Sequence, residues 1–166
     1  MRSTIRTSAI LATLLGLTAT AGEAQSANIT ATATVYTAMT VTGVRSLDFG
    51  NVFPGVAKSI GVAAATSGQF NLTGQNSANV NLTFTLPTDL VSGANNLPIG
   101  TWTGYRNSTA SATAGGTAFT PSGTATAAAF SGTGQLFVYV GGTVTPAAAQ
   151  AAGTYTGTVT LTAAYF

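Results

Sequence analysis

The sequence contains no cysteine and no histidine, and charged residues are scarce. Without cysteine no disulfide can form, so an apolar core and β-sheet hydrogen bonds must hold the fold. Without histidine, a Ser-His-Asp triad, a Cys-His dyad and imidazole metal sites are all excluded. Only five basic and three acidic residues occur among 166. We therefore predict that the protein is not an enzyme, and that it has no catalytic residue, metal site or cofactor.

The charged residues beyond residue 24 are too few and too scattered to form a binding surface of one sign. This part of the chain has three basic residues, Arg45, Lys58 and Arg106, and two acidic residues, Asp48 and Asp89, so its net charge is +1. There is no basic patch, so nucleic acid is not an expected partner. A glycosidase-type carboxylate pair would have to use both aspartates. Asp48 precedes a predicted turn and follows Arg45 closely, which favours a turn or a local ion pair.

The first 24 residues have the pattern of a secretory signal peptide. Arg2 and Arg6 provide a positively charged start, and residues 9–17 form an apolar run that is too short to span a bilayer. Small side chains at the end of this segment predict cleavage after Ala24, with cleavage two or three residues later as alternatives. We predict export through the inner membrane to the periplasm and then to the cell surface or a fimbrium, with no membrane insertion after cleavage.

The rest of the chain alternates apolar and polar residues with a period of two, and no long segment has a helical period. Glycine and proline separate the alternating segments, which predicts an all-β fold. We expect an immunoglobulin-like antiparallel β-sandwich of about seven strands, which a donor strand could complete. The expected organisation is a signal peptide at 1–24, an N-terminal extension or first strand at 25–37, and the sandwich domain at 38–166.

The alternation also predicts where the strands and loops lie. The predicted strands run from Asn28 to near Gly43 (one long strand or two in the same register) and over Val44–Val52, Ser59–Ala64, Gly68–Thr73, Asn79–Leu86, Gly100–Tyr105, Gln135–Val140 and Thr154–Tyr165. The predicted loops are Gly74–Ala78, Pro87–Pro98 and Asn107–Ala129, the last with a weak strand near Phe119.

The last predicted strand has the cleanest alternation in the chain. One face carries Gly153, Tyr155, Gly157, Val159, Leu161, Ala163 and Tyr165. The other face carries threonines, Ala164 and the terminal Phe166. Such alternation indicates a strand with one face in a core and the other toward water.

A terminal strand that alternates between Gly153, the fourteenth residue from the end, and a penultimate Tyr165 resembles the C-terminal signature of chaperone–usher pilus subunits. In that family the last strand borders a groove left by a missing strand. The resemblance implies three partners: a periplasmic chaperone that fills the groove temporarily, an outer-membrane usher, and neighbouring subunits of a homo-polymer whose N-terminal extensions fill it permanently. It assigns chaperone recognition and groove lining to Gly153, Tyr155, Val159, Leu161, Ala163 and Tyr165. An ordinary last strand of a complete domain has the same residue pattern.

Residues 28–36 have the form that a donor strand requires. Nine extended residues reach about 30 Å, and their apolar side chains share one face. The candidate groove-facing residues are Ile29, Ala31, Ala33 and Val35. The same segment also fits the first strand of a complete domain.

Three internal stretches resemble a bacterial secreted domain family that is formally of unknown function, domain-of-unknown-function family 4402. They are Leu47–Val52, Gly68–Gly74, and Leu136–Thr143 with Gly153–Tyr155, and they occur in the family's order. The family is similar to fimbrial subunits. Our first hypothesis is therefore an exported structural subunit of a fimbria or similar appendage that polymerises by β-strand complementation. The alternative is a self-contained secreted or surface-coat β-sandwich with an adhesive or ligand-binding role.

Overall fold

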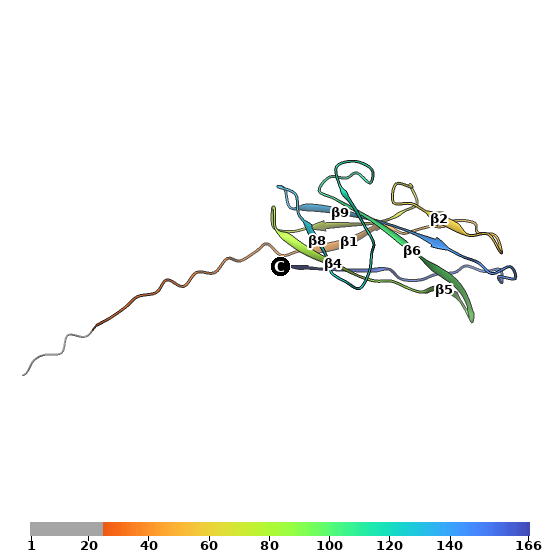
Figure 1. The fold of residues 1–166 in the computed structure, drawn as a ribbon, viewed down its shortest axis with the longest axis horizontal. Coiled ribbons are helices and arrows are strands. Elements are labelled where there is room, and N and C mark those ends of the chain that lie inside the picture. The colour runs from red at the N-terminus through yellow and green to blue at the C-terminus, as the bar shows by residue number, and fades with distance from the viewer. Residues whose placement is uncertain (1–24) are drawn as a thin grey trace, which may run out of the picture. The chain divides into compact units, whose positions relative to one another are not determined.

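The computed structural model describes residues 25–166, so the predicted signal peptide lies outside the described residues. Residues 25–34 are exposed and form neither strand nor helix. The sandwich is a separate unit that comprises Val35–Phe166. Every regular element between residues 25 and 166 is a β-strand, and all of the strand pairs are antiparallel (Figure 1). The predicted all-β antiparallel sandwich is confirmed.

The larger of the two sheets has seven strands. Its main path is β1 (Thr40–Arg45), β3 (Gly68–Thr73), β9 (Gln135–Val144), β6 (Asn95–Asn107) and β5 (Asp89–Ser92). Two short strands lie off this path, β2 (Lys58–Ile60) beside β9 and β7 (Thr117–Phe119) beside β6. β1 pairs only with β3, so its other edge is free within the described chain.

The smaller sheet has three strands in the order β10 (Thr160–Tyr165), β4 (Asn79–Thr85) and β8 (Thr126–Ala129). The register pairs Leu161 with Phe84 and Tyr165 with Val80. β10 has a partner on one side only, so its other edge is free in the same way as that of β1. The two sheets therefore each end in a strand with an unpaired edge.

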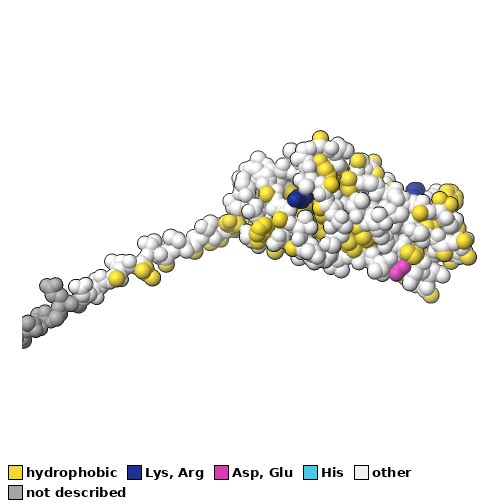
Figure 2. Space-filling view, viewed as in Figure 1, with side chains coloured by type: hydrophobic (Ala, Val, Ile, Leu, Met, Phe, Trp, Pro, Cys, Tyr) yellow, Lys and Arg dark blue, Asp and Glu magenta, His cyan; other side chains and the backbone are white. Residues whose placement is uncertain are grey.

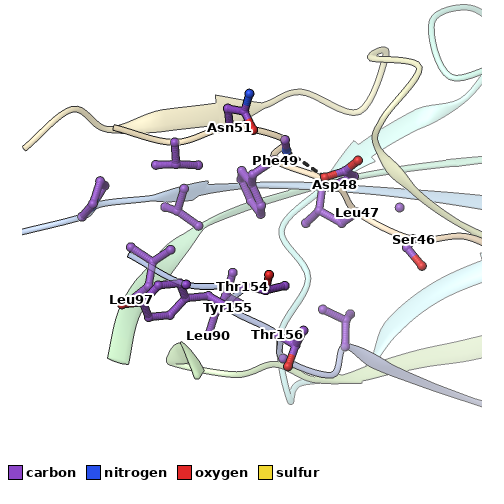
Figure 3. A pocket seen from close by; sticks show the side chains of 18 of the residues that line it. Ser46, Leu47, Asp48, Phe49, Asn51, Leu90, Leu97, Thr154, Tyr155 and Thr156 are labelled. Atoms are coloured by element: carbon purple, nitrogen blue, oxygen red, sulfur yellow. Dashed lines mark hydrogen bonds between the residues drawn. The ribbon is translucent and has the colours of Figure 1, made fainter. Parts of the chain in front are cut away.

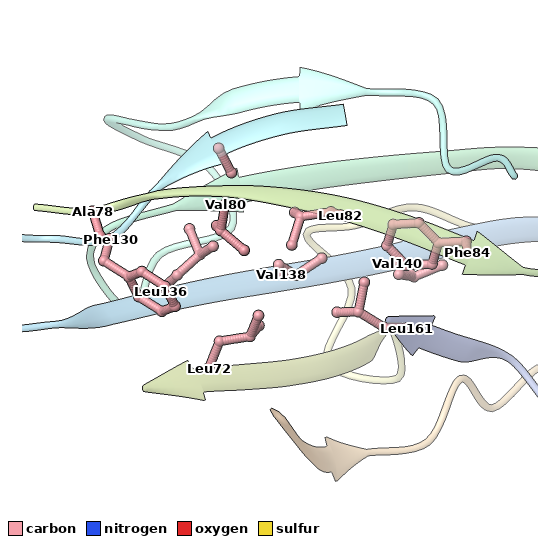
Figure 4. Close-up of a cluster of buried hydrophobic side chains, with 11 residues drawn as sticks. Leu72, Ala78, Val80, Leu82, Phe84, Phe130, Leu136, Val138, Val140 and Leu161 are labelled. Atoms are coloured by element: carbon pink, nitrogen blue, oxygen red, sulfur yellow. The ribbon is translucent and has the colours of Figure 1, made fainter. Parts of the chain in front are cut away.

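The main core lies between the two sheets and explains the period-two pattern. Alternate residues of β4 and β9 point inward, and Leu72 of β3 and Leu161 of β10 join them (Figure 4). The side chains of Leu72, Val80, Leu82, Leu136, Val138 and Val140 are almost fully buried. A strand turns successive side chains to opposite faces, so each of these strands presents every second residue to the core.

A second, smaller core lies toward the end of the sandwich away from the C-terminus. It consists of Phe49, Leu97, Ile99 and Val144, with partly buried side chains around them. Trp102 packs against both cores. It follows Thr101, which has a positive φ of 46° inside a bulge of β6 between Gly100 and Thr103. The irregular backbone in β6 thus lies beside the side chain that packs against both cores.

Ten strands form where about seven were expected, and the differences have physical causes. The predicted loop Pro87–Pro98 is wrong, because β5 and the start of β6 make a hairpin that turns at Gly93, whose φ is 59°. The predicted loop Asn107–Ala129 holds β8 as well as the expected weak strand β7. Alanine has a low strand propensity, so pairing with β4 and not local sequence decides that β8 is a strand.

The predicted strands at both ends of the chain are shorter than expected. The first strand begins at Thr40 and not at Asn28, and Val44–Val52 contributes only the last two residues of β1. Likewise β10 begins at Thr160, six residues after the predicted start at Thr154. A strand needs a neighbour for its backbone groups, and within the described chain these segments find few such partners or none.

Candidate functional site

Two segments that alternate like strands in sequence lie largely unpaired in the structure. Residues 46–54 make one backbone hydrogen bond to another segment, from Asp48 N to Thr66 O (2.9 Å). Residues 153–159 make two, both between Thr156 and Val91 (2.8 and 3.0 Å). The first segment continues from β1 and the second leads into β10, so both extend the free edges of the two sheets.

A groove of about 1040 Å³ lies between these two segments. Figure 3 shows Leu47 and Phe49 projecting from one wall and Leu90, Leu97 and Tyr155 from the opposite side. The floor includes Val140 and Val144 of β9. The groove therefore borders the second core, because Phe49, Leu97 and Val144 line it while remaining at most 8% exposed.

The groove carries almost no charge. Arg45 and Asp48 are the only charged residues that line it. Arg45 donates from Nε to Ser67 O (2.6 Å) and from Nη2 to Ser67 Oγ (2.8 Å). Asp48 accepts from Gly50 N (2.7 Å), the turn role expected for it (Figure 3). Both side chains are hydrogen-bonded to other parts of the chain, Arg45 to Ser67 and Asp48 to Gly50, so the groove suits an uncharged, largely apolar occupant.

Hydrogen bonds hold the groove wall formed by residues 146–159 in place. Gln150 donates from Nε2 to Asn96 O (3.0 Å) and to the Tyr155 hydroxyl (2.7 Å). Tyr155 in turn donates to Ala151 O (2.7 Å). A Cβ on Gly157 would overlap Leu90, so glycine permits this wall to lie close to β5. These contacts fix the wall, and Gln150 and Tyr155, which make them, also line the groove.

The opposite end of the sandwich is closed by Tyr165. Its hydroxyl donates to Thr37 O (3.0 Å) and accepts from Gln75 N (2.7 Å). Its ring contacts Tyr36 edge-on, with centroids 5.2 Å apart, and Phe130 at 6.0 Å. Thr37 also donates from its N to Gln75 Oε1 (3.2 Å). These contacts join the start of the sandwich to its last strand at the end away from the groove.

The structure separates the six candidate residues of the terminal strand into three places. Gly153, Tyr155 and Val159 line the groove. Leu161 is buried in the main core and Ala163 packs against it. Tyr165 lies at the closed end. Only three of the six residues, Gly153, Tyr155 and Val159, therefore line the groove.

The candidate donor residues fall in two units. Ile29, Ala31 and Ala33 lie in the exposed residues 25–34, and the side chain of Ile29 is 96% exposed. Val35 is the first residue of the sandwich unit and is 92% exposed. None of the four belongs to a strand.

Sequence reasoning missed the wall formed by residues 46–54 as part of a site. Leu47, Phe49 and Val52 line the groove, whereas the sequence predicted only that this segment is a strand and that it resembles the family. The apolar residues that line this wall could be recognised in the sequence. What the sequence did not show is that this segment and residues 153–159 face each other across a gap.

The sequence model of a family described as a domain of unknown function (DUF4402) matches residues 39–165. The chain belongs to this family. The DUF4402 match covers every strand and the whole groove, whereas Ile29, Ala31, Ala33 and Val35 precede it. No curated protein and no solved structure matched the chain. A helix of membrane-spanning length and hydropathy does not occur among the described residues.

Proposed function

We propose that this protein is an exported structural subunit that polymerises by strand insertion, with the groove as the acceptor and residues 25–34 of another copy as the donor. One observation carries the proposal. The groove lies between two sheet edges, and its walls are strand-like segments that lack a partner on the facing side. An inserted strand would gain main-chain hydrogen bonds from an edge, and its alternate side chains would enter the apolar floor.

The extension is complementary to the groove in charge and in pattern. From Gln25 to Val44 the chain has no charged residue, and the two charged side chains that line the groove, Arg45 and Asp48, already have hydrogen-bond partners. Ile29 is almost fully exposed, so burying it could contribute about 1.5–3 kcal/mol. Ala31 and Ala33 contribute less, so within residues 25–34 most of the affinity from side chains would come from Ile29, with Val35 where the donor leaves the groove.

Chain direction favours a second copy over the chain's own extension. Thr34 is bonded to Val35, and the neighbouring Tyr36 contacts Tyr165 at the closed end. The groove is at the other end, where the exposed Phe53 and Pro54 line it. A strand that enters there with its residue 35 outermost would run antiparallel to residues 153–159. Another copy can supply such a strand, whereas the chain's own extension is attached at the closed end through Val35 and would enter in the opposite orientation.

The same groove gives a reason for a periplasmic chaperone and an outer-membrane usher. Exposed apolar residues between unpaired edges are prone to aggregation, so an exported subunit benefits from a protein that occupies the groove until assembly. The predicted signal peptide would deliver the chain to the compartment where such a partner acts. The product of assembly would be a fimbria or a similar surface appendage.

Strand complementation can be tested with a chain that begins at Val35, which removes the exposed residues 25–34 and keeps Tyr36 and Thr37. We expect this chain to fold, to stay monomeric where the chain from residue 25 polymerises, and to bind a synthetic peptide of residues 28–36. At one hundred times its Kd the peptide should stabilise the domain by about 2.7 kcal/mol. That corresponds to a rise in Tm of roughly 8 °C for a domain of this size.

The control is a peptide of the same composition in which the apolar residues fall on both faces, and it should leave the Tm unchanged. If the matched peptide gives no shift at saturation and the intact chain is monomeric, the proposal is wrong. Those results would instead favour the self-contained sandwich with an adhesive or ligand-binding role.

A further inference from the structure

The end of the sandwich beside the groove carries an exposed apolar surface, which we call the tip. It consists of Val52, Phe53, Pro54 and Val56 from one loop and Ala147 and Ala148 from another. Gly55 N donates to Ala147 O (3.0 Å), which holds the two loops together. Phe53 is 69% exposed and Val56 is 58% exposed. Figure 2 shows hydrophobic side chains gathered at this end, away from the C-terminus marked in Figure 1.

The other end carries a second exposed apolar surface, which we call the root. It consists of Val35, Tyr36 and Phe166, which are 92%, 48% and 64% exposed. The contact between Tyr36 and Tyr165 brings these residues, from the two ends of the sandwich unit, together. Phe166 lies on the polar face of the last strand, so the core does not account for it. Neither the tip nor the root contains a charged side chain.

We propose that the tip of one copy binds the root of the next, a contact that rests on the proposed strand insertion and extends it. The tip is continuous with the groove, because Val52, Phe53 and Pro54 belong to both. A donor strand that enters at the tip with residue 35 outermost brings its own root to that place. Exposed apolar patches of this kind mark interaction surfaces, and the root is the surface that the donor delivers.

This contact joins two different surfaces, so it is heterologous. Such contacts build open filaments when the rotation between subunits does not close a ring. The inserted strand would provide the attachment, and the contact between tip and root would set the angle between successive subunits. The rigidity of the filament would therefore depend on residues outside the groove.

The test uses the chain from residue 25 onward with Val56→Asp or Ala148→Asp, two exposed tip residues that do not line the groove. The matched control is Ala110→Asp, an exposed loop alanine between β6 and β7. Phe166→Asp tests the root. Assembly is measured by sedimentation velocity over a concentration series, and groove function by affinity for the peptide of residues 28–36, using versions of each variant that begin at Val35.

We expect each tip or root variant to raise the concentration for half-assembly at least tenfold, while Ala110→Asp leaves it within threefold. Peptide affinity should stay within threefold of the parent for every variant. Assembly that is insensitive to tip and root variants overturns this contact but not strand insertion, provided that the peptide still binds. A parent chain that does not bind the peptide overturns strand insertion, and the contact with it.

Discussion

Replacing Ile29 by alanine tests the donor strand at its most apolar position. The side chain is 96% exposed in the single chain, so the substitution removes no packing from the monomer. Surface changes of this kind usually alter stability by less than about 0.5 kcal/mol. The monomer should therefore keep its unfolding midpoint in urea.

The cost should appear only in assembly. The change from isoleucine to alanine removes three carbon atoms, and each buried CH₂ is worth about 0.8 kcal/mol. The loss is then about 2.4 kcal/mol if the groove buries the side chain fully, which corresponds to roughly a fifty-fold weaker Kd. Isothermal titration of the Val35 chain with peptides of residues 28–36, with and without the substitution, measures this difference directly.

The matched control is Thr30→Ala in the same peptide, because Thr30 lies on the opposite face of the strand. We expect this control to change the Kd less than threefold. Equal effects of both substitutions would show that the peptide binds without a defined face. An unchanged Kd for Ile29→Ala would refute the register that makes Ile29 a groove-facing residue.

Four further substitutions test the sandwich itself. Leu161→Ala should lower the free energy of unfolding by about 2–5 kcal/mol in urea, because it empties part of the main core; a smaller loss would contradict its placement there. Tyr165→Phe removes both hydrogen bonds of the Tyr165 hydroxyl and should cost about 1–3 kcal/mol by the same measurement. Gly134→Ala should destabilise by more than about 1 kcal/mol, since its φ is 72° and a Cβ would overlap the Gly74 carbonyl. Burial raises the pKa of Tyr139 above its ordinary value of about 10, against a smaller opposing effect of Arg45. The folded state then holds the phenol proton more tightly, so stability present below pH 10 should fall as the pH rises beyond it, and less steeply in Tyr139→Phe.

Alternation located several strands accurately. β3 matches its prediction at both ends, and β4 ends one residue early. Both strands present every second side chain to the main core, so the alternation of apolar residues in the sequence shows which face is buried. β5 and β8 were missed because short polar or alanine-rich strands carry no such pattern. Their pairing with β6 and β4 makes them strands.

Part of the candidate site was also visible in the sequence. Gly153, Tyr155 and Val159 were singled out and line the groove, whereas Leu161 and Ala163 were singled out and pack in or against the main core. Parity alone could not separate these two groups, because they share one face of one continuous pattern. From Thr160 onward the segment is β10 and pairs with β4, so its apolar face lies in the core. Before Thr160 this pairing is absent, and the same face of the segment lines the groove.

The sequence by itself determined the class of this protein. The period of two and the scarcity of charged residues specify a β-protein with few charged side chains, because these are local properties of the residues. Tertiary structure decided which strand-like segments have partners. Residues 44–52 and 154–159 were predicted as strands just as β3 was, yet only the packing of two sheets leaves residues 46–54 and 153–159 facing each other across a groove. Whether a segment pairs into a sheet depends on the strands that the fold places beside it, so the sequence of that segment alone does not determine its pairing.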